Sequence, residues 1–274
     1  MATATAGLAR TPRVPRWVML CAYLAVLIAA EAFIAIGNQV EETAYEEMGL
    51  AVHILLLFAL IVHGTVVWER SPVFGALLLA MSLASLIRVF SLAIPLYTFT
   101  IVQRLALVSA PFLASIAAVA YVQRLRARDL GLVPRSWRDL PVQSAIGLTG
   151  IPLGLLEFAI LNPEPWIDAI TASGIVVGTL AIFLATGISE EVVFRGIMLR
   201  RAIEGLGEMR GLLFVSVTFT ALHIFFWSVT DLVFVFGVAL FYGVAVIRTK
   251  SLWGVIVSHT LGNVMLYLIA PFTL

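Results

Sequence analysis

The stretch WVMLCAYLAVLIAAEAFIAIG, Trp17–Gly37, is an apolar run about as long as a helix that crosses a membrane. Such a helix needs about 20 mainly apolar residues, and it bonds its own backbone groups because lipid offers them no partner. The whole chain shares this character: 61% of its 274 residues are hydrophobic and 12% are charged, with a mean hydropathy of +1.05. Soluble domains carry about 25% charged residues. The sequence therefore predicts an all-α, polytopic membrane helix bundle.

Eight further apolar runs follow the first, and a bilayer favours a helix for each of them. They are Leu50–Trp68, Val73–Ile94, Leu105–Val122, Val142–Ile160, Ile170–Ile188, Leu212–Ser228, Val233–Val246 and Leu252–Leu268. Gln103 and Arg104 blur the entry of the run Leu105–Val122, so we predict eight to nine transmembrane helices, with nine favoured. For the first run, a signal peptide cleaved after AEA (Ala30–Ala32) is an alternative, but the apolar segment continues beyond that site.

Loop charge predicts the orientation in the membrane. Basic residues gather before the first run (Arg10, Arg13, Arg16), in the segment 123–140, and after the sixth and eighth runs, whereas QVEETAYEEM (39–48) and NPEPWIDA (162–169) are acidic. The positive-inside rule then places the N-terminus in the cytoplasm and the C-terminus outside. The scarcity of lysine is typical of GC-rich bacterial genomes, so we expect an integral protein of a bacterial inner membrane whose surroundings are the lipid bilayer.

Composition also excludes several classes of partner and site. A net charge of +1 provides no basic signal for nucleic acid. The single cysteine, Cys21, allows neither an intrachain disulfide nor a cysteine-based zinc site. The basic loop 123–141 is the best division of the chain. It separates N-terminal transmembrane helices of unknown role (1–122) from a C-terminal part (142–274) that holds the clustered polar residues.

Ionisable residues inside apolar runs are candidates for function, because an ionised side chain at mid-membrane costs about 2.5–3.5 kcal/mol. In the first half they are scattered. Glu31 and Arg88 are suited to an interhelical ion pair, and His53 and His63 have the character of satisfied core histidines. Glu157, near the end of its run, is expected to reach the headgroups.

The second half carries three polar clusters on three runs: SEEVVFRG (189–196), FTALH (219–223) and SHTLGN (258–263). Residues spaced i,i+4 share one face of a helix. Glu191 therefore pairs with Arg195, and His259 projects beside Asn263. Glu190 lies about 100° round the helix from Glu191 and is free to face a cavity.

Each cluster alone has an ordinary structural explanation. Glu190 and Glu191 suit a helix N-terminus, His223 suits a core position, and His259 with Asn263 suits an interhelical hydrogen bond. Together in order they favour a shared site, in which Glu190 activates a water and a histidine and an amide stabilise the oxyanion. We expect no cofactor. Glutamate with two histidines is also a ligand set for zinc, so a metal remains the alternative.

The three clusters, written EEVVFR, FTALH and HTLGN, resemble the motifs of the CAAX protease and bacteriocin-processing (CPBP) family of glutamate-type intramembrane endopeptidases. The resemblance covers about residues 145–270 and includes the approach RTKSLWGVIVSHTLGN. It implies an all-helical membrane core with a site that opens toward the cytosol. Glu190 is similar to the water-activating base and His223 to the second catalytic residue. Glu191 with Arg195 resembles the pair that positions the base, and His259 with Asn263 the oxyanion-stabilising pair.

The leading hypothesis is an integral-membrane, CPBP-type endopeptidase without a metal that hydrolyses a peptide bond near the cytosolic membrane face. Its partner would be a peptide or membrane-protein substrate, and the sequence does not determine the oligomeric state. The alternatives are a non-enzymatic scaffold or immunity-type protein, and a transporter that uses Glu190 as a proton site. The run boundaries place Glu190 near the cytosolic end of its helix and His223 deep in the next, which an interfacial helix at Gly196–Leu206 would reconcile.

Overall fold

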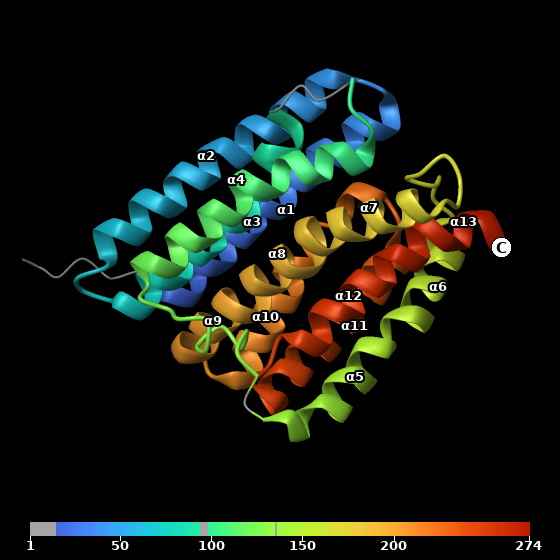
Figure 1. The fold of residues 1–274 in the computed structure, drawn as a ribbon. Helices are drawn as coiled ribbons and strands as arrows, with labels where there is room; N and C mark the ends of the chain where they lie inside the picture. Colours follow the sequence, from blue (N-terminus) through green and yellow to red (C-terminus); the bar gives the residue numbers. More distant parts are fainter. Residues whose placement is uncertain (1–14, 94–97, 135) are drawn as a thin grey trace, which may run out of the picture.

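The protein is a bundle of long helices (Figure 1). The computed structural model describes residues 15–93, 98–134 and 136–274, and in these ranges nine helical spans are long and apolar enough to cross a membrane. The first four spans are α1 (Arg16–Val40), α2 (Thr43–Val67), α3 (Pro72–Ala93) and α4 (Ile101–Val122). The predicted all-α fold is confirmed for the described residues.

The other five spans come from the second half of the chain. They are α5 with α6 (Leu140–Leu148, Gly150–Leu161), α7 to α9 (Ala172–Leu206), α10 (Glu208–Ala221), α11 (Val229–Thr249) and α12 with α13 (Trp253–Val264, Ala270–Thr273). Short 3₁₀ turns precede α5 (Trp137–Asp139) and follow α10 (Ile224–Phe226). Figure 1 shows α1–α4 grouped on one side, with α7–α12 between them and the pair α5–α6.

The helix of the fourth run, α4, begins at Ile101, four residues before the apolar run Leu105–Val122. Thr100 is the N-cap of α4: its hydroxyl accepts from the backbone N–H of Gln103, and the Gln103 amide oxygen accepts from the backbone N–H of Thr100. This reciprocal capping box satisfies two backbone donors at the start of the helix. The polar residue that blurred the entry is therefore the signal that starts the helix, and the fourth run is a full span.

Two other boundaries also differ from the apolar pattern. α2 begins at Thr43, so most of the acidic stretch 39–48 is helical rather than a loop. Acidic residues are favourable at the start of this helix, because a helix N-terminus attracts negative charge. The sixth run does not stop at Ile188 but continues without a break to Leu206, so no separate interfacial helix exists at Gly196–Leu206. Arg10, Arg13, Ile94 and Arg135 lie outside the described residues.

This continuous helix resolves the mismatch in depth. Glu190 lies near the middle of the 35-residue span Ala172–Leu206, and His223 lies near the far end of the span that starts at Glu208. Because the two helices are antiparallel and joined by a tight turn at Gly207, the middle of one lies beside the far part of the other. Both residues are therefore deep in the bundle.

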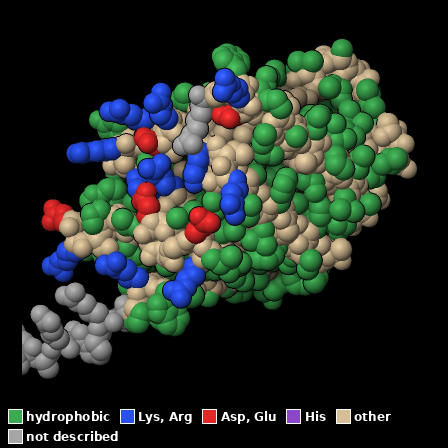
Figure 2. Space-filling model, turned by 90° about the horizontal axis from the view of Figure 1, so that it is seen from below, with side chains coloured by type: hydrophobic (Ala, Val, Ile, Leu, Met, Phe, Trp, Pro, Cys, Tyr) green, Lys and Arg blue, Asp and Glu red, His purple; other side chains and the backbone are tan. Residues whose placement is uncertain are grey.

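Charged side chains gather at one end of the bundle (Figure 2). This end holds the start of α1 and α5 and the ends of α9 and α11, and its cations include Arg16, Arg70, Arg126, Arg128, Arg200, Arg210, Arg248 and Lys250. The opposite end carries the acidic residues Glu41, Glu42, Glu164 and Asp168. The separation agrees with an integral membrane protein, and by the positive-inside rule the basic end is expected to be cytosolic.

The loop between α4 and α5 is docked on the helix that carries the third polar cluster. The carbonyl of Gly131 accepts from the N–H of Leu252 at 3.0 Å, and that of Leu132 accepts from the indole N–H of Trp253 at 2.9 Å. Gly131 has a φ of +76°, in the left-handed region that glycine adopts without a steric penalty. The loop therefore fixes the start of α12.

One continuous core connects the two halves. It includes Leu27 and Leu78 from the first half and Phe194 and Phe219 from the second. The division of the chain at 123–141 stays a prediction, because this shared core shows that the halves pack together without showing that either is a separate unit.

Candidate active site

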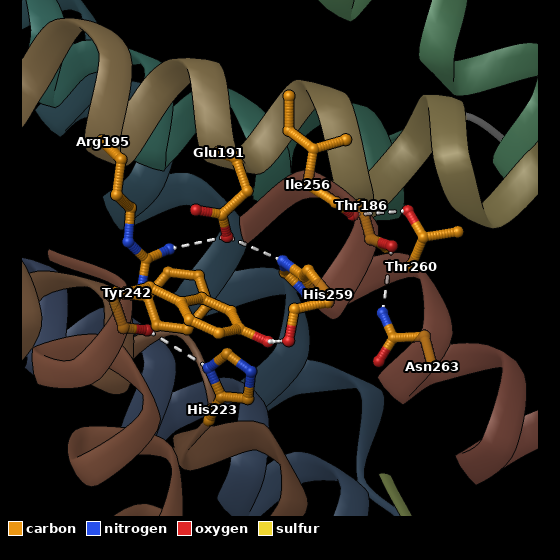
Figure 3. Close-up of polar contacts among 11 residues, drawn as sticks. Thr186, Glu191, Arg195, His223, Tyr242, Ile256, His259, Thr260 and Asn263 are labelled. Carbon is orange, nitrogen blue, oxygen red and sulfur yellow. Dashed lines mark hydrogen bonds and ion pairs between the residues drawn. The ribbon is translucent and has the colours of Figure 1, made fainter. Parts of the chain in front are cut away.

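A polar chain links the Glu-Glu pair to the third cluster (Figure 3). Oε1 of Glu191 accepts from Nη1 of Arg195 at 2.9 Å and lies 2.8 Å from Nδ1 of His259. Glu191 and Arg195 are almost completely buried, with exposures of 0% and 3%. The predicted pairing of Glu191 with Arg195 is confirmed. The bond to His259 adds a tether between two helices that sequence spacing did not indicate.

Aromatic rings hold the guanidinium of Arg195 in place. Its Cζ lies 4.2 Å from the ring centre of Phe219 and 5.5 Å from that of Tyr242. Guanidinium groups are attracted to aromatic faces, more so where water is excluded. Phe219, the first residue of the second cluster, is therefore part of the packing that orients Arg195.

The helix is irregular on both sides of the two glutamates. α8 (Ser189–Glu191) lies between π-helical segments, Phe183–Ile188 and Val192–Met198. A π-helical segment carries an extra residue per turn, and such segments occur frequently at functional sites. Here they set how the glutamates are directed relative to the rest of the span.

Glu190 faces a cavity of about 250 Å³ that it shares with His223, His259 and Asn263. Its carboxylate has neither a hydrogen bond nor an ion pair with the residues that the structure describes. Glu191 and Arg195 do not line this cavity and lie behind it. The structure thus brings four of the six predicted residues to one space and puts the other two in a supporting position. Their catalytic roles stay a prediction.

The second histidine sits at the end of a helix. His223 follows the last turn of α10, and its Nδ1 lies 3.2 Å from the carbonyl oxygen of Phe219. A carbonyl only accepts, so Nδ1 carries the proton in this contact. In the neutral ring Nε2 is then an acceptor.

Asn263 has a partner that the sequence did not reveal. Its Nδ2 donates to Oγ1 of Thr186 at 2.9 Å, a residue one turn before Glu190 on the facing helix. An amide carries two N–H groups, so one donor of Asn263 is free. His259 and Asn263 do share a helix face, as predicted, because both line the cavity.

Arg88, from α3, also lines the cavity. Its Nε donates to the Glu31 carboxylate at 2.7 Å, which confirms the predicted interhelical ion pair. The same guanidinium also donates through Nη2 to the carbonyl of Leu222, next to His223. Sequence reasoning treated Arg88 only as half of a structural pair. The signal available was a cation within an apolar run, which by itself does not say what it contacts.

Glu157, on α6, was expected to reach the headgroups but lines the same cavity. A run boundary cannot distinguish these positions, because the length of an apolar segment gives no information about which face of the helix is covered by neighbours. Its contacts are considered below.

The described ranges contain no group of three His, Cys, Asp or Glu side chains that could hold a metal ion. Glu190, His223 and His259, the set that suggested zinc, are therefore not grouped as metal ligands in this geometry, and the zinc alternative stays an open prediction. That the protein needs no cofactor stays a prediction.

The apolar helical spans of the described residues, with this buried polar cluster between them, define an integral membrane protein. A family model, Rce1-like, described as Type II CAAX prenyl endopeptidase Rce1-like, matches residues 171–265. The family resemblance inferred from the motifs is confirmed for this part of the chain, which contains all six predicted residues. The match supports a protease and indicates a membrane endopeptidase of the CAAX type. Comparisons with curated proteins and with solved structures found no significant match.

Proposed function

We propose that the protein is an integral-membrane endopeptidase that hydrolyses a peptide bond with a water activated by Glu190. The observation that carries this proposal is the pairing pattern of the two adjacent glutamates. Glu191 is bound to Arg195 and His259, whereas Glu190 has no polar partner among the described residues and faces a cavity that contains His223. A carboxylate without a partner in a cavity is suited to take and return a proton.

Attack begins with a water between Glu190 and His223. Glu190 accepts a proton from the water, and at the same time the water oxygen bonds to the carbonyl carbon of the substrate. Nε2 of His223 accepts a hydrogen bond from the same water, because Nδ1 is committed to the carbonyl of Phe219. The C–N bond of the tetrahedral intermediate then breaks as Glu190 donates the proton to the leaving amine, which leaves the other product as a carboxylic acid.

The negative charge that forms on the substrate oxygen needs donors. The second N–H of Asn263 is one, since the first is used by Thr186. His259 supplies another from Nε2 in its doubly protonated form, with the ring held through Nδ1 by Glu191. Arg195 does not contact the substrate in this proposal but holds Glu191 in position.

The reaction takes place deep in the bundle in this proposal. The position near the cytosolic face was expected from the run boundaries and from the family resemblance, and it stays a prediction, because the 35-residue span that carries Glu190 near its middle is longer than the bilayer core. A substrate segment must therefore enter between helices, which favours a peptide or membrane protein that is itself apolar.

The test uses Glu190→Gln and His223→Ala in the full chain, purified in detergent. A general base contributes about 10²–10⁴-fold to rate, so each variant is expected to lose at least 100-fold in kcat. A substrate is first found as a precursor that accumulates in membranes containing the Glu190→Gln variant.

Glu164→Gln is the matched control for charge removal, because Glu164 is exposed and does not line the cavity. If both site variants cleave as fast as the parent, the assignment is wrong. A parent without peptidase activity, combined with variants that lose only thermal stability, would favour the scaffold. Substrate flux in proteoliposomes would favour the transporter.

A further inference from the structure

The cavity contains a second carboxylate that the proposed reaction does not use. Glu157 lines the cavity with Glu190, and its side chain forms no hydrogen bond or ion pair with the described residues. It lies on α6, toward the end of the bundle that carries the acidic loops. The desolvation of an ionised carboxylate inside the bundle costs free energy unless a partner of opposite charge offsets it.

A third carboxylate without a partner lies on the neighbouring helix α11. Asp231 is fully buried, and neither of its oxygens has a hydrogen-bond partner among the described residues. It lies on α11, which packs against α6, the helix that carries Glu157. Its backbone N–H is capped by Ser228, and the helix N-terminus favours its negative charge.

The direction of Asp231 follows from its position on α11. Four residues of this helix line the cavity: Phe234, Val235, Val238 and Tyr242. They follow Asp231 at three, four, seven and eleven positions, which is the spacing of a single helix face. Asp231 therefore lies on the side of α11 that faces the cavity, one turn before Phe234, although it does not itself line the cavity.

Aromatic rings complete this part of the cavity. The rings of Trp166 and Tyr267 are stacked, with centroids 3.7 Å apart and planes 10° from parallel, and both line the cavity. The backbone N–H of Trp166 donates to the backbone carbonyl of Tyr267 at 3.0 Å, and this bond holds the two residues together. Aromatic faces attract cations, tryptophan most strongly.

The two arginines near the cavity already have carboxylate partners. Arg88 is bound to Glu31, and Arg195 is bound to Glu191. Glu191 also holds the protonated His259, which leaves one positive charge without a carboxylate of its own. Glu157, Asp231 and Glu190 form no ion pair among the described residues, so the balance around the cavity is negative. A metal ion does not suit this negative balance, because these ranges contain no group of three ligating side chains.

We propose that Glu157, Asp231, Trp166 and Tyr267 form an acidic subsite that binds a positively charged side chain of the substrate, arginine or lysine. This inference rests on the proposed function and adds the substrate class to it. A guanidinium matches the subsite well, because its planar fork bonds carboxylates and its face stacks on aromatic rings. The enzyme would then select an apolar segment that carries one basic residue near the cleaved bond.

The test is a binding measurement on the full chain in detergent, with Glu190→Gln present so that the peptide stays intact. Two probes are compared: an acetylated and amidated apolar pentapeptide with a central arginine, and the same peptide with citrulline, which is neutral and nearly identical in shape. Charge-assisted hydrogen bonds contribute about 1.5–3 kcal/mol, so the arginine peptide is expected to bind roughly ten-fold tighter or better.

Adding Glu157→Gln should abolish the preference, and Asp231→Asn should weaken it. Glu164→Gln, the exposed control, should leave it intact. Thermal melting of each variant reports folding, and the two subsite variants are measured in parallel so that the test does not depend on one of them.

Equal affinity for the two peptides overturns the subsite, as does a preference that survives in both subsite variants. The proposed function is judged separately from cleavage by the parent. Charge-selective binding without cleavage would support the subsite and contradict the proposed peptidase. Cleavage without a charge preference would support the peptidase and contradict the subsite.

Discussion

At the scale of single residues, the buried pair Glu191–Arg195 has an exposed counterpart on the same continuous helix. Arg200 and Glu204 are also spaced i,i+4, with Nε and Oε1 3.2 Å apart, but 41% and 33% of their side chains are exposed. Removing one partner of a buried pair costs about 3–5 kcal/mol, and exposed pairs contribute about 0–1 kcal/mol. We therefore expect Glu191→Gln to lower the melting temperature strongly and Glu204→Gln to leave it almost unchanged.

The measurement is thermal denaturation of both variants in detergent beside the parent. Glu191→Gln should also lower activity, because it releases the tether to His259. Adding Arg195→Met should recover part of the stability without the activity. Equal shifts for the buried and exposed pairs would contradict this account.

At the scale of elements, the position of α12 depends on its close packing with α6. A Cβ added at Gly154 would collide with the carbonyl of Gly262, next to Asn263. Small residues allow such close approach between membrane helices. We expect Gly154→Ala to cost about 1–3 kcal/mol through overpacking and to reduce activity by moving the oxyanion donors.

Gly237→Ala on α11 is the matched control, because a Cβ there meets nothing within 4 Å. It should be neutral or stabilising by up to about 1 kcal/mol, since alanine has the better helix propensity. Melting temperatures and cleavage rates of the two variants check this expectation, which fails if both alanines act alike.

The C-terminal end of α10 is held in position by contacts from another helix. The last carbonyls of a helix have no partner within it, and Arg88 of α3 binds that of Leu222. The chain Glu31–Arg88–Leu222 therefore fixes the turn that carries His223. We expect Arg88→Met to lower kcat by roughly 10–100-fold with little change in KM, because small misplacements of a reacting group are costly.

Ser91→Ala is the control for this prediction, since among the described residues the Ser91 hydroxyl bonds only the backbone carbonyl of Arg88. The double variant Glu31→Gln with Arg88→Met removes the stray carboxylate and should recover stability but not kcat. If the double variant regains full activity, positioning by Arg88 is the wrong explanation.

At the scale of the whole molecule, the distribution of charge predicts the orientation in the membrane. The basic end is expected to be cytosolic. In a Cys21→Ala background, Ala127→Cys lies in the basic loop and Glu164→Cys in the acidic one, and both positions are exposed. A membrane-impermeant maleimide added to intact cells should label Glu164→Cys alone. Labelling of Ala127→Cys instead would reverse the orientation.

Much of the fold follows from local properties of the chain. The length of each apolar run predicts a helix because a lipid environment leaves the backbone no other partner. The boundaries were less predictable. At Thr100 a capping box starts the helix among polar residues, and after Ile188 helical structure continues through buried charged residues, since neighbouring helices rather than lipid surround them.

The sequence by itself determined the helical bundle, the family motifs and the pair Glu191–Arg195, because these depend on run length and on i,i+4 spacing within one helix. Only the tertiary structure decided that Arg88 reaches Leu222, that Glu157 faces the cavity and that Glu191 holds His259. These contacts join residues of separate helices. Their formation depends on how helix faces pack against each other, which spacing along the chain does not encode.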